Sequence, residues 1–369
     1  MPRNAAPKTP SQPQNEPAAG NIADLDALYA QAGLVRNRRE TPAGITRQLR
    51  QTRLARMDAE ELRPPAPAPQ IAENGVPLLR VSQWQQKPKW LWHGFSTRLG
   101  GLSRIYSANQ GDSNENFTGE LNLGFTAADE RELVIRNRLL FTEAVTGSAS
   151  TPLVTLRQIH SNGLHYAARW DAARERPQRG DGLMTDEPGI LLAVQTADCI
   201  PVLVADRKRK AVAAFHAGWR GAVKRIVETG IGRMRTEFGS KPEDLIAAIG
   251  PGVGPCCYSV GDEVLTEFES QFAYARELFH EVFDSDSVRK KYPMLFLTQR
   301  APGHSPIGPA LHLDLLEANR RQLLDAGLKA DAIQTTGGCT SCHRELFFSH
   351  RASQGHAGRM MSAIGIRPK

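Results

Sequence analysis

Three short apolar runs follow one another in the middle of the chain, and they constrain the fold more than any other feature. Residues 190–205 read ILLAVQTADCIPVLVA, two runs of branched residues separated by TADC, and residues 211–215 supply the third run. Runs of this length and composition predict buried strands. Helical spacing follows over residues 222–238 and 313–326, and Gly327 is a typical helix stop. The irregular alternation predicts a mixed α/β (α+β) domain.

The N-terminal part of the chain differs in composition from the rest. Residues 1–70 hold 10 of the 24 prolines and a single aromatic residue, Tyr29. Such a segment can bury little apolar surface, so we expect a disordered or weakly helical tail over residues 1–75 and one domain over residues 76–369. The tail has no apolar run of the kind that a secretory signal requires. We therefore expect a cytoplasmic protein without a membrane-spanning segment.

The net charge argues weakly for a polyanionic partner. The chain has 46 Lys and Arg against 39 Asp and Glu, a formal charge of +7. Beyond residue 70 the counts are 36 basic and 32 acidic, which is ordinary for an enzyme surface. We therefore expect no nucleic-acid partner.

Three motifs place polar side chains where predicted strands end. They are QIHS with His160, TADC with Cys199, and FHAGWRG with His216. Strand ends present side chains to a cleft, and two imidazoles with one thiolate make a zinc site whose fourth position stays open for chemistry. The spacings of 39 and 17 residues are not diagnostic, so spacing alone favours a buried cysteine with two hydrogen-bonded histidines over a metal site.

The motifs taken together resemble the laccase-domain family. This family is also called the multicopper polyphenol oxidase or purine nucleoside phosphorylase family and includes the bacterial peptidoglycan editing factor. The similarity covers residues 90–366, and the TADC and HAGWRG pair is its most specific part. The motifs, in order, are HGFSTRLGGLS, LNLGF, NR, QIHS, DGLMT, TADCIPVLVAD, HAGWRG, IGPGVGPCCYSVGDEV and FFSHR.

The resemblance implies a fold, an activity and a metal site. It implies a four-layer α/β/β/α domain and a metal, usually zinc and alternatively copper, on His160, Cys199 and His216. It further implies a phosphorylase, a glycosyl transferase acting on adenosine, inosine and methylthioadenosine with phosphate, and an adenosine deaminase (hydrolase) side activity. The arginine of the NR motif, Arg138, is implied as a substrate contact. The chain departs from the family at FFSHRA, where Ala352 replaces an arginine, and at GHAGRMM, where TGR is common.

The chemistry of these reactions suggests further candidates. An open zinc site can activate water for attack on C6 of a purine, with Asp181 or Asp198 as the general acid or base. Either carboxylate could instead fix a turn. Phosphorolysis requires cationic groups for phosphate, and Arg138 and Arg220 are the candidates. Arg220 could instead form a structural salt bridge, and GPGVGP at residues 250–255 is interpreted as a turn.

The CTSCH motif at residues 339–343 has several interpretations. It matches the C-x-x-C-H pattern of covalent haem attachment, but that attachment requires export. It could also supply two ligands to a second zinc, although Cys256 and Cys257, being adjacent, are poor candidates for the other two. We interpret the motif as a structural turn.

Four other functions compete with the zinc-dependent phosphorylase. A copper-dependent polyphenol oxidase is not favoured, because multicopper centres use H-x-H pairs and no two of the ten histidines are two residues apart. A thiol hydrolase would use Cys199 as its nucleophile. A peptidoglycan-precursor editing hydrolase would act on a cell-wall substrate, and an interaction module would bind a partner without turnover.

Overall fold

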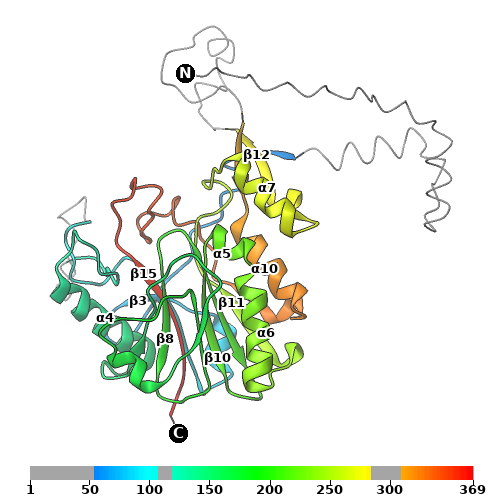
Figure 1. The fold of residues 1–369 in the computed structure, drawn as a ribbon. Coiled ribbons are helices and arrows are strands. Elements are labelled where there is room, and N and C mark those ends of the chain that lie inside the picture. The colour runs from blue at the N-terminus through cyan, green and yellow to red at the C-terminus, as the bar shows by residue number, and fades with distance from the viewer. Residues whose placement is uncertain (1–53, 107–118, 284–308, 369) are drawn as a thin grey trace, which may run out of the picture. The chain divides into compact units, whose positions relative to one another are not determined.

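The computed structural model describes residues 54–106, 119–283 and 309–368 (Figure 1). The predicted tail up to residue 53 lies outside the described residues. Among the helices that are described, none is long and apolar enough to span a membrane.

Two six-stranded mixed sheets form the centre of the domain, and a small third sheet lies beside them. The first sheet has the order β2 (Gln70–Ile71), β3 (Pro77–Leu79), β4 (Leu91–Ser96), β15 (Met360–Ile366), β8 (Leu191–Thr196) and β5 (Leu153–Val154). The second sheet has the order β14 (Ile333–Thr335), β11 (Leu245–Ile249), β9 (Ile200–Asp206), β10 (Val212–Ala217), β7 (Gly182–Thr185) and β6 (Leu164–Tyr166). The small sheet has the order β1 (Ala55–Asp58), β12 (Phe279–Phe283) and β13 (Ala310–Leu313).

Strand β9 shows how the two large sheets pack face to face. Its side chains alternate between two apolar clusters, as strand geometry requires. Leu203 and Ala205 lie in the cluster that also contains Val194 of β8, between the sheets. Val202 and Val204 lie in the cluster that contains the helices of the second sheet. Every residue of β9 is buried, which explains why its sequence is apolar from Ile200 to Ala205, and Asp206 is the charged residue at its end.

Helices cover the outer faces of both sheets (Figure 1). Helix α4 packs on the first sheet through residues such as Phe141 and Val145, and helices α6 and α10 pack on the second sheet. The four-layer α/β/β/α fold is therefore confirmed. The α-helices are α3 (Ser82–Gln86), α4 (Arg131–Thr146), α5 (Trp219–Val223), α6 (Ile226–Phe238), α7 (Asp262–Gln271) and α10 (Leu315–Asp325). Short 3-10 turns lie at Arg169–Ala173, Pro242–Asp244, Ala275–Leu278 and Ala330–Ala332.

One of the two predicted helices forms as predicted, and the other is divided into two helices. Helix α10 lies within the predicted range, begins at an N-cap where Asp314 accepts from the Glu317 amide, and is followed by Gly327 at φ +95°. The helix predicted over residues 222–238 is instead divided into α5 and α6 at Arg225, whose φ is +56°. The carbonyl of Ala222 accepts from the Gln322 side chain of α10, which competes with continuation of the helix.

The TADC motif connects the two large sheets. Strand β8 belongs to the first sheet and β9 to the second, so the chain passes between them through residues 197–199. Asp198 has φ +95°, which is an unfavourable backbone conformation for a residue other than glycine. This strained turn places Cys199 at the start of β9.

Residues 54–75, which the sequence assigns to the tail, contact the domain. Strand β1 pairs in parallel with β12, and Arg56 forms an ion pair of 2.8 Å with Glu281, 225 positions away. The carbonyl oxygen of Pro64 accepts from Nε2 of His343 at 3.0 Å. The predicted boundary after residue 75 thus differs from the structure, in which the domain includes residues from Leu54 onward. Proline content indicates extended chain but does not reveal a pairing partner so distant in sequence.

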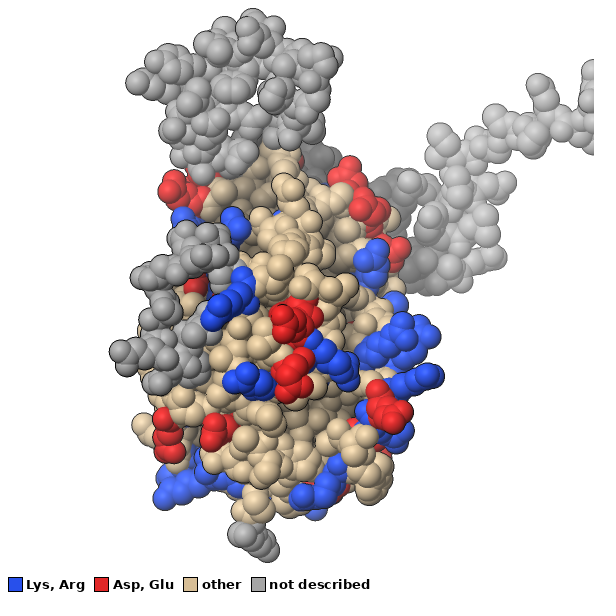
Figure 2. All heavy atoms as spheres, turned by 90° about the vertical axis from the view of Figure 1, so that its left-hand side faces the viewer, with Lys and Arg blue, Asp and Glu red and all other residues tan. Residues whose placement is uncertain are grey.

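Charged side chains are mixed on the face shown in Figure 2. Lys and Arg side chains alternate there with Asp and Glu, and neither sign covers a large continuous area. A uniform basic surface, the usual feature of nucleic-acid binding, is not what this face presents.

A truncation tests the contribution of residues 54–71. A chain that begins at residue 72 is expected to unfold about 3–8 °C below one that begins at residue 54, because it lacks β1, β2 and the contact with His343. Thermal unfolding of the two chains measures the difference, and equal midpoints would show that this segment adds nothing to stability.

Candidate metal centre

Strand register brings the three predicted ligands together at one end of the sheets. In the β9–β10 pair Ala217 lies opposite Ile200, which places His216 close to Cys199. The ligand atoms of His160, Cys199 and His216 all lie within 4.8 Å of one another. Cys199 Sγ is 3.8 Å from His160 Nε2, close to the roughly 3.6 Å that a sulfur and a nitrogen have on a tetrahedral zinc. The donor set and its spacing therefore suit a metal ion.

Gly218 lies two residues after His216, at a position where the candidate ligands Cys199 and His160 leave no room for a side chain. A Cβ at this position would lie 2.8 Å from Cys199 Sγ and 3.0 Å from Cδ2 of His160. Any larger residue would push these side chains apart. The first glycine of the HAGWRG motif therefore has a steric role in the metal centre.

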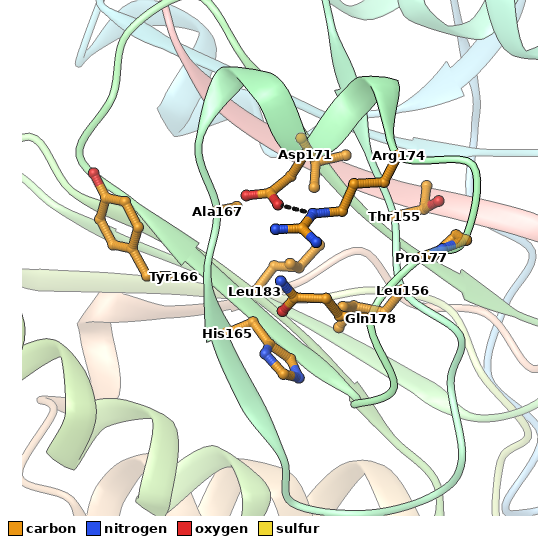
Figure 3. A pocket seen from close by; sticks show the side chains of 11 residues that line it. Thr155, Leu156, His165, Tyr166, Ala167, Asp171, Arg174, Pro177, Gln178 and Leu183 are labelled. Atoms are coloured by element: carbon orange, nitrogen blue, oxygen red, sulfur yellow. Dashed lines mark hydrogen bonds and ion pairs between the residues drawn. The ribbon is translucent and has the colours of Figure 1, made fainter.

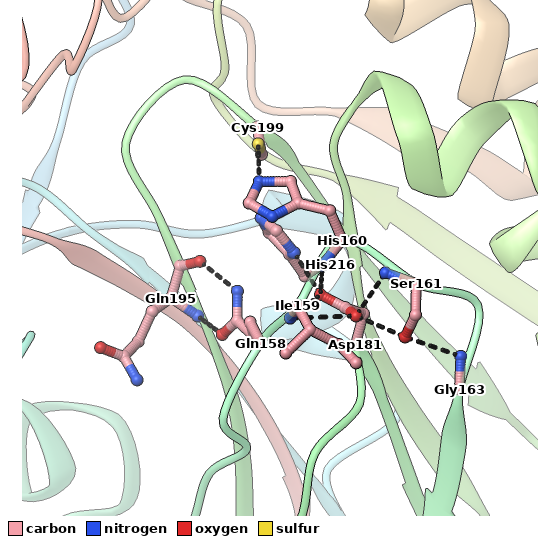
Figure 4. Close-up of polar contacts among 9 residues, drawn as sticks. All are labelled: Gln158, Ile159, His160, Ser161, Gly163, Asp181, Gln195, Cys199 and His216. Carbon is pink, nitrogen blue, oxygen red and sulfur yellow. Dashed lines mark hydrogen bonds and ion pairs between the residues drawn. The ribbon is translucent and has the colours of Figure 1, made fainter.

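Asp181 orients two of the three ligands (Figure 4). Its carboxylate is fully buried and accepts from five donors: the amides of Ile159, His160 and Ser161, the Ser161 hydroxyl, and Nδ1 of His216. The contact with His216 is 2.9 Å and leaves Nε2 of that ring to face Cys199 and a metal ion. The amide contacts hold His160 at φ +57°, in the left-handed region.

The QIHS loop is fixed at a second point by Gln158. Its side chain donates to the carbonyl of Gln195 and accepts from the amide of the same residue, both at 2.7 Å (Figure 4). This pair of bonds attaches the loop to the end of β8. Sequence analysis did not single out Gln158 beyond the motif that contains it.

Cys199, His216 and Asp181 shift one another's pKa values toward the charged forms, which favours binding of a cation. Burial alone would raise the pKa of Cys199, but the neighbouring His216 and His160 outweigh it and lower this pKa to about 6. Burial would lower the pKa of His216, whereas Cys199 and Asp181 raise it to about 9. Burial also acts to raise the pKa of Asp181, yet its hydrogen bonds with His216 and Ser161 hold that pKa below the usual range. A metal ion could replace the proton that the thiolate and carboxylate attract.

The metal ligands line an open cavity of about 770 Å³. A volume of this size is typical of small-molecule sites. Its lining includes aromatic side chains, Trp219 and Tyr258, and several guanidinium groups. Those arginines are Arg157, Arg220, Arg351 and Arg359. The Asp171–Arg174 pair borders another, much smaller pocket of about 10 Å³, room for roughly one water, so it is too small for a substrate (Figure 3).

The two arginines suggested by the sequence differ in position. Arg220 lines the cavity, stacks on the Trp219 ring at 4.3 Å, and makes no ion pair among the described residues. Arg138 is not among the described residues that line the cavity. It lies on α4, where its Nε donates to the carbonyl of Leu123 at 2.8 Å and its guanidinium stacks on Phe125 at 4.1 Å. Burial and, secondarily, Arg131 lower the pKa of Arg138 to about 10.

Asp198 accepts hydrogen bonds from three donors. Its carboxylate accepts from the hydroxyls of Thr340 and Ser349 and from the amide of Arg351, each at 2.7 Å. These bonds connect the TADC turn to the FFSHR motif. They match the turn-fixing alternative rather than proton transfer. Ala352, where the chain departs from the family, is not among the described residues that line the cavity.

A second group of potential ligands lies outside the cavity lining. The Sγ atoms of Cys256, Cys257, Cys339 and Cys342 all lie within 4.8 Å of one another. The expectation that Cys256 and Cys257, being adjacent, are poor partners for Cys339 and Cys342 is therefore wrong, because the loops after β11 and β14 converge. His343 is turned away from the group, toward Pro64. Among the described residues, neither potential ligand group resembles the histidine-rich centre of a multicopper oxidase.

The fold and this geometry define an α/β/β/α protein with a candidate metal centre at the floor of a basic cavity. The chain belongs to the family described as multi-copper polyphenol oxidoreductase laccase, whose model matches residues 92–367.

Relatives of known sequence and structure support this assignment. The purine nucleoside phosphorylase of Bacteroides thetaiotaomicron is 33% identical over 270 residues, 72% of this chain and 92% of that protein. Purine nucleoside phosphorylase YlmD of Geobacillus stearothermophilus is 33% identical over 295 residues, 77% of this chain and 96% of its own. The crystal structure of that YlmD matches with a TM-score of 0.63 at 29% identity, covering 82% of this chain and 100% of the other.

Substitution of Asp181 tests its role in orienting the ligands. Asp181→Asn is expected to lower metal affinity about 10- to 100-fold, because an amide would place N–H groups against the donors that now face a carboxylate. Metal competition titrations measure this, with Asp186→Asn, an exposed carboxylate on the same segment, as the control. An unchanged metal affinity in Asp181→Asn would contradict the role of Asp181 in orienting the ligands.

Proposed function

We propose that the protein is a zinc-dependent purine nucleoside phosphorylase that cleaves adenosine, inosine and methylthioadenosine. The observation that supports this most directly is the cavity, which combines a three-ligand metal set with arginines and aromatic side chains. The names of its relatives point to the same reaction. In this reaction an oxygen of phosphate bonds to C1′ of the ribose, the C1′–N9 bond breaks, and ribose 1-phosphate and the purine base leave.

The arginines of the cavity are proposed to bind phosphate. Guanidinium groups bind phosphate oxygens through pairs of parallel hydrogen bonds. Arg220 is exposed to the cavity, and its stacking on Trp219 restricts its orientation. Arg351 is held by two hydrogen bonds. Its Nη1 donates to the Ser259 hydroxyl at 2.9 Å, and its backbone amide donates to the Asp198 carboxylate. These contacts fix both groups before phosphate arrives, which reduces the entropy lost on binding.

The aromatic side chains are proposed to contact the purine base. Trp219 and Tyr258 both line the cavity and offer flat apolar surfaces for stacking. Burial, and then the charge of Cys199, raise the pKa of Tyr258 well above its usual value. Its hydroxyl therefore stays protonated and can donate a hydrogen bond to a ring nitrogen of the departing base.

Two imidazoles and a thiolate suit zinc, which supplies an electrophile at the cavity floor when bound. His160, Cys199 and His216 would hold it, and Asp181 keeps His216 in the tautomer that presents Nε2. Three protein ligands leave one position open. That opening favours adenosine deamination as a second reaction in the same cavity, in which water adds at C6 and ammonia leaves. We further propose a cytoplasmic location, since the five free thiols persist in a reducing compartment.

Product analysis tests the reaction. With phosphate, inosine and adenosine are expected to yield ribose 1-phosphate and free base, and without phosphate cleavage should stop. Adenosine alone is expected to release ammonia slowly. Free ribose as the product would mean a hydrolase, and turnover only of a phenol with copper, or only of a muropeptide precursor, would favour the oxidase or the peptidoglycan-editing function.

The phosphate assignment is tested by Arg220→Ala and Arg220→Lys. The alanine variant is expected to raise the KM for phosphate about 10- to 100-fold, since a charge-assisted hydrogen bond contributes roughly 1.5–3 kcal/mol. Lysine keeps the charge but loses the paired geometry, so a smaller increase is expected. Arg235→Ala, an exposed arginine on α6, is the control. An unchanged KM for phosphate in both Arg220 variants would rule out this role.

A further inference from the structure

Four cysteines from two loops converge beside the cavity wall. Cys256 and Cys257 follow β11, and Cys339 and Cys342 follow β14. These two strands are parallel neighbours, so the loops after them leave the sheet at the same edge. Gly252 and Cys339 form an isolated β-bridge that continues this pairing. The sheet therefore brings together two pairs of thiols about 80 residues apart in sequence.

The spacing of the sulfurs suits a tetrahedral ion. Cys342 Sγ lies 3.5 Å from Cys256 Sγ and 3.4 Å from Cys257 Sγ. Four sulfurs at 2.3 Å from a zinc ion are about 3.8 Å apart, and all four atoms here lie within 4.8 Å of one another. The two separations that involve Cys342 are about 0.3–0.4 Å shorter than this value, and no pair exceeds it by more than about 1.0 Å, so small side-chain shifts would complete the coordination.

The surroundings of the four sulfurs are those of a closed site. Cys339 is fully buried and Cys256 nearly so, and they pack with Val253 and Leu62 in one apolar cluster. The amide of Gly254 donates to Cys339 Sγ at 3.2 Å, a contact that stabilises a thiolate. Among the described residues no further nitrogen or carboxylate ligand joins the set. Structural zinc sites are of this kind, with four protein ligands and no open position.

We propose that Cys256, Cys257, Cys339 and Cys342 bind one structural zinc ion. This inference is independent of the proposed function. The ion would stabilise the wall of the cavity: Thr340, next to Cys339, donates to Asp198 at 2.7 Å, and Asp198 precedes the cavity ligand Cys199. On the other loop Cys257 precedes Tyr258, which lines the cavity.

The test uses the full chain, purified under reducing conditions without chelator. Elemental analysis of the wild-type protein is expected to give two zinc ions per chain. The variant His160→Ala/His216→Ala, which lacks two cavity ligands and keeps all five cysteines, should retain one. X-ray absorption of that variant should show four sulfur neighbours at about 2.3 Å. A variant without zinc would overturn the proposal.

Three further measurements keep the result decisive. If the double histidine variant does not fold, X-ray absorption of the wild-type protein decides: more sulfur per zinc than the single thiolate of the cavity set supports the proposal, and one sulfur per zinc contradicts it. Mass spectrometry of the unreduced, denatured chain addresses oxidation, since a mapped disulfide between Cys342 and Cys256 or Cys257 in the freshly purified protein would replace the metal site. Cys342→Ser should lose one zinc and unfold at a lower temperature, with Arg344→Ala, an exposed side chain two positions further on, as the control.

Discussion

The buried carboxylate of Asp181 is the interaction on which the site depends. Removing a charge from water is unfavourable unless hydrogen bonds replace the lost hydration, and five donors do so here. Those donors belong to two segments, the QIHS loop and the end of β10. One charge thus determines both the backbone conformation of His160 and the ring orientation of His216. The ligands are fixed before any metal binds, so the affinity of the site is not reduced by ordering a loop.

Asp198 plays a comparable role on the other side of Cys199. It connects the strained turn between the two sheets to Thr340, Ser349 and Arg351, which come from two segments near the C-terminus. Its unfavourable φ is tolerated because three strong hydrogen bonds depend on it. A carboxylate engaged in this way is poorly suited to proton transfer, which leaves Tyr258 as a better donor toward a departing base.

Sequence reasoning predicted the features that have local signals. The strands around TADC and the helix before Gly327 follow from apolar spacing, and His160, Cys199 and His216 stand at predicted strand ends, although only the family resemblance implied them as metal ligands. The family resemblance implied Arg138 as a substrate contact, but a short motif does not reveal that its side chain donates to the Leu123 carbonyl rather than lining the cavity. Sequence reasoning also missed the contacts of residues 54–75 and the convergence of Cys256 with Cys342. Both depend on strand pairing between segments far apart in the chain.

The charges around the cavity link metal and anion binding. Four guanidinium groups line it, and the carboxylates of Asp181 and Asp198 are already occupied by hydrogen bonds. A divalent cation bound to one thiolate would add further positive charge to the cavity, where water screens charges less than it does at a flat surface. An anion such as phosphate would relieve that repulsion, so bound metal would raise the affinity for phosphate. Because such coupling is reciprocal, bound phosphate would also strengthen retention of the metal by His160, Cys199 and His216.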